Sequence, residues 1–232
     1  MADDKVISVV IVTYNADKTL QRCLDSIYAQ SNKRIEIIVI DGKSTDHTVQ
    51  ILASNKIDYW KSEEDSGIYD AMNKALFHIT TKNVFFLGAD DVLLPDFSEM
   101  ITAVIKPNTI YYANVIYKDR KVSGLISPYA QAKSGIFHQS IIYPALIFKK
   151  YKYNPKYKIA ADYALNMKLH KDPEFTFEYV DFTIALYNHT GVSSETADIA
   201  FEKDKSKLIY NNFGQRIWLG YMFRKLKSIY KS

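Results

Sequence analysis

The fold is decided at the start of the chain, where residues 6–13 read VISVVIVT. This run is almost entirely apolar and β-branched, which is typical of a strand covered on both faces of a parallel sheet. A helical pattern follows over residues 17–29, and Asn15 or Asp17 is placed to cap its start. The opening of the chain therefore predicts the first strand–helix unit of an α/β domain.

The same alternation continues outward from this unit. Further strands are expected at 35–40, 57–60 and 84–87, and helices at 44–55, 68–79 and 95–105. Beyond them the pattern predicts a hairpin of strands at 109–117 and 121–127, a strand at 141–148, a helix at 160–170, strand over 175–187 and helix from 197. The sequence predicts a mostly parallel central sheet flanked by helices, with a helical C-terminal tail.

Composition indicates a globular chain with a substantial core: of 232 residues, 47% are hydrophobic and 24% are charged. The single cysteine, Cys23, excludes an intramolecular disulfide and a cysteine metal cluster. No apolar run approaches the ~18 residues needed to span a bilayer. The acidic opening MADDKVISVV is the reverse of a signal peptide, so a cytoplasmic protein is expected.

Charge is divided unevenly along the chain. Residues 1–110 carry 11 Lys and Arg against 16 Asp and Glu, whereas residues 111–232 carry 19 against 10. The balance is therefore −5 in the first half and +9 in the second, which gives the net charge of +4. A basic half suits an anionic membrane, a nucleic acid or an acidic substrate, and charge alone does not choose among them.

Polar residues gather where three predicted strands end: Thr13-Tyr14-Asn15, Asp41 and Asp90-Asp91. Ligands of open α/β sheets bind at the carboxyl ends of the strands. The chain has neither G-x-G-x-x-G nor a P-loop, so a phosphate-bearing ligand needs another neutraliser. Asp90 and Asp91 are placed to hold a divalent cation, although an Asx turn explains the pair equally well.

Five segments, in this order, resemble the motifs of the inverting glycosyltransferases of family 2, which have the GT-A fold. They are VVIVTYNADKTLQRCLDSIYAQ (9–30), IEIIVIDGKSTDHTVQIL (35–52), SEEDSGIYDAMNKAL (62–76), FFLGADDVLLP (85–95) and IAADYALNMKL (159–169). The third, together with HQSIIY (138–143), resembles the branch that makes capsule, lipopolysaccharide and colanic acid. One departure is Gly88, which stands where the family's metal motif often has its first Asp.

The resemblance implies a role for each matched residue. It implies nucleotide and donor contacts for Thr13, Tyr14, Asn15, Asp41, Asp65, Gly67, Tyr69, Asp70, Asn73, Lys74, Ala89 and Asp90. It implies a divalent metal, manganese or magnesium, near Asp90, Asp91 and His189, and it places His138 and Gln139 beside the donor or acceptor sugar. Asp162 matches the catalytic base.

Ordinary structural roles remain open for several of these residues. Asp162 could cap the helix that it begins, Lys74 could be a solvated lysine, and His189 could be a packing residue. Two other function classes also remain: a nucleotide-sugar-binding module without turnover, and a nucleotidyltransferase. The chain lacks the glycine-rich loop that the second class has after its first strand.

The resemblance divides the chain into a GT-A domain at 1–196 and a basic helical extension at 197–232. Residues 1–110 would be its nucleotide-binding half and 111–196 its acceptor half. The implied partners are a nucleoside-diphosphate sugar, with UDP favoured, and a saccharide or lipid-linked acceptor. Residues 215–232 carry five cations and no acid among recurring apolar residues. With the lysine-rich stretch 149–158, this tail is expected either to dock on the domain or to contact the inner face of the cell membrane, and nucleic acid is not expected.

Overall fold

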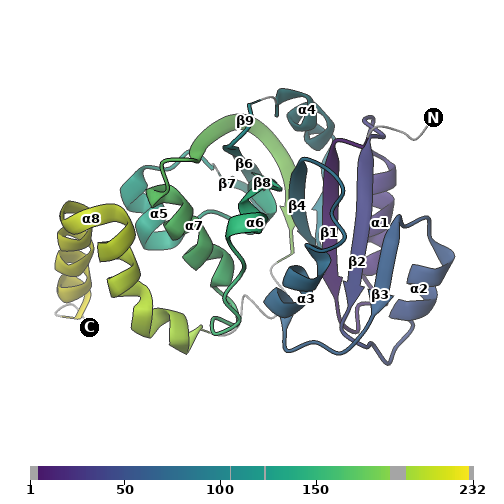
Figure 1. Ribbon diagram of the computed structural model, residues 1–232, viewed down its shortest axis with the longest axis horizontal. Coiled ribbons are helices and arrows are strands. Elements are labelled where there is room, and N and C mark those ends of the chain that lie inside the picture. Colours follow the sequence, from purple (N-terminus) through teal and green to yellow (C-terminus); the bar gives the residue numbers. More distant parts are fainter. Residues whose placement is uncertain (1–4, 105, 123, 189–196, 230–232) are drawn as a thin grey trace.

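The apolar run that opens the chain forms β1 (Ile7–Thr13), at the centre of the parallel part of the sheet. A computed structural model describes residues 5–104, 106–122, 124–188 and 197–229 (Figure 1). β1 pairs in parallel with β2 (Ile35–Asp41) on one side and β4 (Asn83–Gly88) on the other, and β2 pairs with β3 (Tyr59–Ser62). Every residue of β2 is buried, and all of them except Glu36 and Asp41 are apolar.

The sheet becomes mixed beyond β4. Its order is β3-β2-β1-β4-β8-β6-β9-β5, with β7 beside β6. The added strands are β5 (Val92–Leu93), β6 (Thr109–Tyr117), β7 (Arg120–Val122), β8 (Ile141–Pro144) and β9 (Thr176–Tyr187). β8 is antiparallel to both β4 and β6, whereas β6 and β9 are parallel. The strand–helix pattern ends where this mixed part begins.

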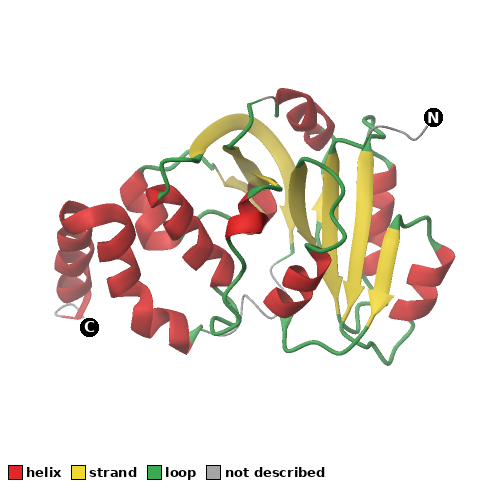
Figure 2. Ribbon diagram, in the orientation of Figure 1, coloured by secondary structure: helices red, strands yellow, loops and turns green. Residues whose placement is uncertain are grey.

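Helices cover both faces of the sheet, as Figure 2 shows. They are α1 (Leu20–Tyr28), α2 (Thr48–Ser54), α3 (Ile68–Ala75), α4 (Asp96–Ala103), α5 (Pro128–Ser134), the 3₁₀ turn η1 (His138–Ser140), α6 (Ile147–Lys150), α7 (Ala161–Lys171) and α8 (Ile199–Ile229). One buried cluster joins β1 to α1, α2 and α4, and the other joins the sheet to α3, α6, α7 and α8. Among the described helices, none is both long and apolar enough to cross a membrane.

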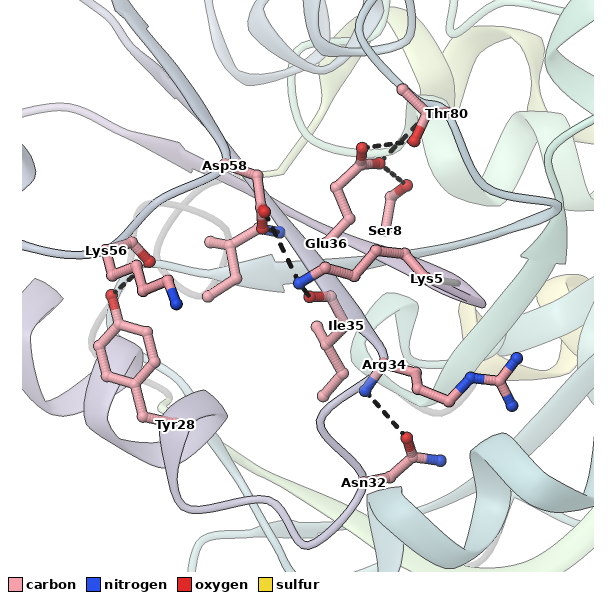
Figure 3. A network of polar contacts seen from close by, with 11 residues as sticks. Lys5, Ser8, Tyr28, Asn32, Arg34, Ile35, Glu36, Lys56, Asp58 and Thr80 are labelled. Atoms are coloured by element: carbon pink, nitrogen blue, oxygen red, sulfur yellow. Dashed lines mark hydrogen bonds and ion pairs between the residues drawn. The ribbon is translucent and has the colours of Figure 1, made fainter. Parts of the chain in front are cut away.

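A buried carboxylate, Glu36, lies near the amino ends of β1 and β2, away from the strand ends that carry the polar residues. Glu36 is only 7% exposed, and it accepts hydrogen bonds from the Ser8 hydroxyl and from the hydroxyl and amide of Thr80 (Figure 3). These bonds tie β1, β2 and the loop before β4 together. Because its charge is satisfied by hydrogen bonds, Glu36 is a structural residue.

Three local expectations were wrong. The strand predicted over 141–148 stops at Pro144; the Ala145 amide donates once more to the carbonyl oxygen of Lys82, at 2.8 Å, and the chain then turns into α6. Neither Asn15 nor Asp17 caps α1, which starts later, after Thr19. Helix α5 was not predicted, although Ser127 caps it and Pro128 occupies its first turn, which is a recognised start signal.

Candidate active site

A cavity of about 930 Å³ opens at the carboxyl ends of β1 and β4, where the sequence placed its polar cluster. Its walls come from segments far apart in the chain: 12–19, 65–72, 86–90, 134–139, 158–163 and 187–188. The parallel strands therefore supply one side of the cavity, and the loops of the mixed half supply the other. Cavities at such strand ends are where α/β proteins bind ligands.

Most of the predicted site residues line this cavity. They are Thr13, Tyr14, Asn15, Asp65, Gly67, Tyr69, Ala89, Asp90, His138, Gln139 and Asp162. The hydroxyl of Thr13 is buried and has no hydrogen-bond partner among the described residues, so it is available to a ligand. Asp41, Asp70, Asn73, Lys74 and Asp91 lie outside the lining, and His189 lies outside the described residues.

Asp162 stands in the first turn of α7 and is held by a buried tyrosine. The Tyr69 hydroxyl lies 2.5 Å from Oδ1 of Asp162 and 2.7 Å from the carbonyl oxygen of Ile159. Burial and the neighbouring Asp162 charge raise the pKa of Tyr69 well above its usual range, so this hydroxyl keeps its proton. The Tyr69 hydroxyl therefore orients Asp162, and a contact between Tyr69 and the diphosphate or the donor sugar stays a prediction.

The two adjacent aspartates after β4 have different surroundings. Asp91 is 1% exposed, and its two oxygens accept from the backbone amides of Gly88 and Asn188, at 3.1 and 2.8 Å. Burial raises the pKa of Asp91 to about 7. Asp90 instead lines the cavity, and burial also raises its pKa. The pair therefore combines the two roles that the sequence left open, a turn former and a carboxylate available to a ligand.

Gly88 is required by the approach of these two carboxylates. A Cβ at this position would lie 2.6 Å from Oδ2 of Asp91 and 2.9 Å from Oδ1 of Asp90. An aspartate could not replace it without moving both side chains. The departure from the family's metal motif is thus explained by packing.

The residues present fit a divalent cation that the substrate helps to hold. The described residues contain no group of three His, Cys, Asp or Glu side chains that could bind a metal by themselves. Asp90 offers a carboxylate whose burial disfavours its charge, a cost that a bound cation would offset. Magnesium-type cations typically take one or two carboxylates and complete their coordination with water and substrate phosphates. Each oxygen of Asp91 already accepts one backbone amide, and a contact between Asp91 and a metal stays a prediction.

Asp41 organises the loop beside the cavity. It is completely buried, and its carboxylate accepts from the amide and hydroxyl of Ser44 and from the hydroxyl of Ser62. The following Gly42 lets Asp65 approach, since a Cβ there would lie 2.6 Å from Oδ2 of Asp65. Direct contact between Asp41 and a nucleotide stays a prediction.

The polar residues of α3 hold neighbouring loops. Asn73 exchanges two hydrogen bonds with the backbone of Tyr153, at 2.9 and 3.0 Å. Asp70 accepts from the Ser66 amide and pairs with Lys74 at 3.4 Å. These contacts fix the loop that carries Asp65 and Gly67. Asp70, Asn73 and Lys74 therefore do not line the cavity themselves, and they hold the segments that do or that lie next to it.

His138 is buried beside Asp162. Its Nε2 lies 2.9 Å from the Tyr153 hydroxyl, and its ring stacks on Phe86 with centroids 5.1 Å apart. Burial lowers the pKa of His138, so the ring is neutral at pH 7. A neutral imidazole at the cavity wall offers hydrogen bonds without adding charge.

Two cations near the cavity were not predicted as site residues. Lys158 lines it, and its Nζ donates to the Ser66 carbonyl at 3.0 Å. Lys158 was expected to belong to a membrane-facing lysine stretch, although this residue directly precedes the motif that contains Asp162. Arg22 of α1 donates to the backbone oxygen of Asp90 at 2.9 Å. Arg22 lies within the first of the five matched segments, but no role was predicted for it, and the packing of α1 beside β4 brings it to Asp90.

Comparison with known proteins identifies the family. The model of glycosyl transferase family 2 matches residues 8–172, which include β2 to β8, Asp90 and Asp162. The chain belongs to glycosyl transferase family 2. A glycosyltransferase of PGL/p-HBAD biosynthesis from Mycobacterium bovis is 32% identical over 204 residues, covering 82% of this chain and 79% of the relative. The chain is therefore a glycosyltransferase.

Solved structures of the same fold confirm the GT-A architecture. S. aureus TarS, residues 1–349 in complex with UDP-GlcNAc, aligns with a TM-score of 0.75 at 20% identity, covering 94% of this chain and 71% of TarS. The mannosyltransferase PcManGT from Pyrobaculum calidifontis, in complex with GDP-Man and Mn²⁺, aligns with a TM-score of 0.64 at 16% identity, covering 89% and 62%. This similarity establishes the fold that the sequence predicted.

Proposed function

We propose that this glycosyltransferase moves a sugar from a nucleoside-diphosphate sugar to a hydroxyl of a saccharide or lipid-linked acceptor, with metal dependence and inversion at C1. We propose further that the product belongs to a cell-surface polysaccharide. The observation that carries the proposal is one cavity in which two carboxylates from distant parts of the chain, Asp90 and Asp162, face the same space. UDP is the favoured nucleotide, and TarS, which aligns over 94% of this chain, is a UDP-GlcNAc complex.

Asp162 is the proposed general base. The acceptor hydroxyl must lose a proton as its oxygen attacks C1 of the sugar, and an ionised carboxylate within hydrogen-bond reach can take it. Tyr69 holds one oxygen of Asp162, which leaves the other for the acceptor. A single displacement from the face opposite the leaving group inverts the anomeric centre.

The leaving nucleoside diphosphate gains negative charge as the bond to the sugar breaks. Asp90 would hold the divalent cation, which supplies electrostatic stabilisation of the diphosphate when bound. Lys158 lies at the same cavity beside the loop that contains Asp65 and Gly67, and it adds a fixed positive charge there. Thr13, the last residue of β1, and Asn15, in the loop that follows, line the cavity and are the proposed contacts of the nucleotide.

The proposal is tested first by donor binding and then by the base. In a thermal-shift screen of nucleotide sugars with and without Mn²⁺, a true donor at ~100 times its Kd stabilises the protein by ~2.7 kcal/mol. Asp162→Asn then keeps the size of the side chain and removes its basicity, so release of nucleoside diphosphate in the presence of acceptor falls by ~10²–10⁴-fold. The affinity for the donor is unchanged, because the base contacts the acceptor.

The matched control is Asp172→Asn, which changes an acid at the far end of α7, outside the cavity. It keeps both activity and donor binding. Loss of donor binding in Asp162→Asn would instead make Asp162 a binding or structural residue. Tight donor binding by the unaltered protein, without any turnover, would favour a binding module over an enzyme.

A further inference from the structure

The C-terminal helix is a helical hairpin. Within α8, Gly214 has φ 80° and ψ 172°, which breaks the helix into segments 199–213 and 215–229. The segments contact each other: the Trp218 indole donates to the Ser206 hydroxyl at 2.9 Å, and the rings of Tyr210 and Trp218 lie 5.6 Å apart. The chain therefore folds back on itself at Gly214.

The second segment packs against the protein through one face only. Ile217, Trp218 and Tyr221 lie against the core cluster that contains α7. The guanidinium of Arg224 lies 5.2 Å from the ring centroid of Tyr129 in α5. This inner face fixes which way the opposite face points.

The opposite face carries three exposed apolar side chains. Leu219, Phe223 and Leu226 are 52%, 69% and 51% exposed, and their spacing of four and three residues places them on one side of a helix. We call these three residues the outer stripe. Helix faces in water are normally polar, so an ordered stripe of this kind marks a contact surface.

Positive charge surrounds the outer stripe. Arg216 and Lys227 are exposed on the same segment, and residues 215–232 contain no acid. Beside the segment, a groove of about 760 Å³ runs between α5 and the hairpin. Five of the residues that line it are lysines or arginines of these two elements: Lys133 of α5, and Lys205, Arg224, Lys225 and Lys227 of the hairpin.

The hairpin occupies one end of the molecule. Figure 1 shows α8 at the left end of the long axis, beyond α5 and α7, with α2 and β3 at the opposite end. Of its two segments, the one nearer the C-terminus is outermost. The outer stripe can therefore meet a flat surface without the rest of the chain intervening.

We infer that the outer stripe and its flanking cations bind the surface of an anionic lipid bilayer, with the second segment of α8 lying in the interface. An amphipathic helix with Leu and Phe on one side and Lys and Arg beside them binds in this way. A second copy of the chain is disfavoured, because a symmetric contact would bring the cations of both copies together. The inference goes beyond the proposed transfer reaction and does not depend on it.

The lysine-rich stretch 149–158 is not part of the proposed membrane surface, and its share in the contact stays a prediction. The lysines of residues 149–158 were expected to share the membrane contact. Lys150 instead pairs with Asp172 and Glu174, and Lys156 pairs with Asp204. Lys158 lines the active-site cavity. The proposed membrane surface is therefore confined to the hairpin and the groove beside it.

The test is co-sedimentation of the full chain with vesicles of phosphatidylcholine alone or with phosphatidylserine, without substrate. The protein should pellet only with the anionic vesicles, at about 50 mM salt, and should be released at about 0.5 M, where the Debye length falls below ~5 Å. Phe223→Asp should abolish pelleting. The matched control is Phe77→Asp, which changes a side chain that is 79% exposed in the turn after α3. This variant should pellet like the unaltered protein.

Charge is tested separately. Arg216→Ala with Lys227→Ala should weaken partitioning by about 25-fold, at about five-fold for each cation near an anionic surface. Lys56→Ala with Lys82→Ala removes the same charge from exposed positions outside the hairpin and should change partitioning little. Unchanged thermal unfolding of each variant shows that the fold survives.

Three results would overturn the inference: no pelleting by the unaltered chain, equal loss in variants and controls, or binding that ignores salt and lipid charge. A dimer in light scattering that Phe223→Asp dissolves, without vesicle binding, would assign the stripe to a second copy. Retention on RNA without vesicle binding would assign the cations to nucleic acid. A failure of nucleotide-sugar turnover alone leaves the vesicle result intact, so the two proposals fail separately.

Discussion

The hydroxyl of Tyr69 has two acceptors within reach, the carbonyl oxygen of Ile159 and Oδ1 of Asp162. It carries one proton, so it donates to one of them at a time. While Asp162 is ionised, the proton points to the carboxylate. In the proposed mechanism the proton of the acceptor goes to the other oxygen of Asp162, so Oδ1 remains an acceptor for the Tyr69 hydroxyl. Tyr69 thus satisfies Asp162 in both of its states.

We predict that Tyr69→Phe lowers kcat/KM by ~10–100-fold, since a hydrogen bond to a charged group contributes ~1.5–3 kcal/mol. The lost bond favoured the ionised carboxylate, so the acidic limb of the kcat/KM profile should move to higher pH. Donor affinity should stay the same. A purely structural Tyr69 would lower the melting temperature without moving the pH profile, so both are measured.

Asp90 and Asp91 are predicted to fail in different ways when replaced. Asp90→Ala should abolish Mn²⁺-dependent donor binding while the protein keeps its stability, because the side chain faces the cavity. Asp91→Ala should destabilise the fold by roughly 2–4 kcal/mol, since the buried amides of Gly88 and Asn188 lose their acceptor. Thermal unfolding and donor titration separate the two. Identical behaviour of both variants would contradict this division.

At the scale of elements, backbone hydrogen bonding explains where the sequence pattern misled. Residues 141–148 are apolar throughout, and periodicity cannot separate a buried strand from a strand followed by a short helix. In the structure the strand ends at Pro144, whose pairing with Asn83 is the last one between β8 and β4. Near α1, the side chain of Asn15 accepts from the Thr45 amide in another loop, so it is not available as a cap.

Gly214 is the element-scale residue with the clearest consequence. Its combination of φ 80° and ψ 172° is accessible almost only to glycine, at a cost of ~1–3 kcal/mol for other residues. Nothing lies within 4 Å of a Cβ placed there, so Gly214→Ala tests the backbone alone. We predict lower stability of that size and a redder Trp218 emission as the hairpin opens. Gly220→Ala would not serve as control, since its Cβ meets Tyr129 at 3.2 Å; Ser54→Ala on α2 does.

At the scale of the whole molecule, two partly buried histidines link stability to pH. Burial lowers the pKa of both His138 and His170 in the folded state. Below the ordinary value of ~6.5 the unfolded chain binds protons that the folded chain does not, so stability falls as pH falls. Above that value their contribution to stability is complete.

We therefore predict that each histidine lowers the free energy of unfolding in urea as pH falls from 6.5 to 5.5, with a limiting slope of ~1.4 kcal/mol per pH unit. Asp91, whose pKa burial raises to about 7, takes up a proton in the folded chain over the same range and opposes this trend. The effect of His138 is therefore measured as the difference in free energy of unfolding between the unaltered protein and His138→Gln, which should change with pH, whereas the difference for the exposed His47→Gln should not. A difference for His138→Gln that stays constant with pH would show that the His138 ring is not shielded from protons.

The sequence alone determined the parallel half of the fold and the family. Because β1 and β2 are buried on both faces, most of their residues are apolar. A polar residue, Thr13 or Asp41, marks the end of each strand. These are local signals, because each depends on neighbours in the chain. The motifs around Asp90 and Asp162 carried the chemistry for the same reason.

Only the tertiary structure decided what each polar side chain does. Asp90 and Asp91 are adjacent in sequence, and burial of one and exposure of the other to the cavity separate their roles. Tyr69 and Asp162 are hydrogen-bonded although they are 93 residues apart in the sequence. Such contacts depend on how distant segments pack. The residues next to a side chain in the sequence therefore do not determine which residues contact it in space.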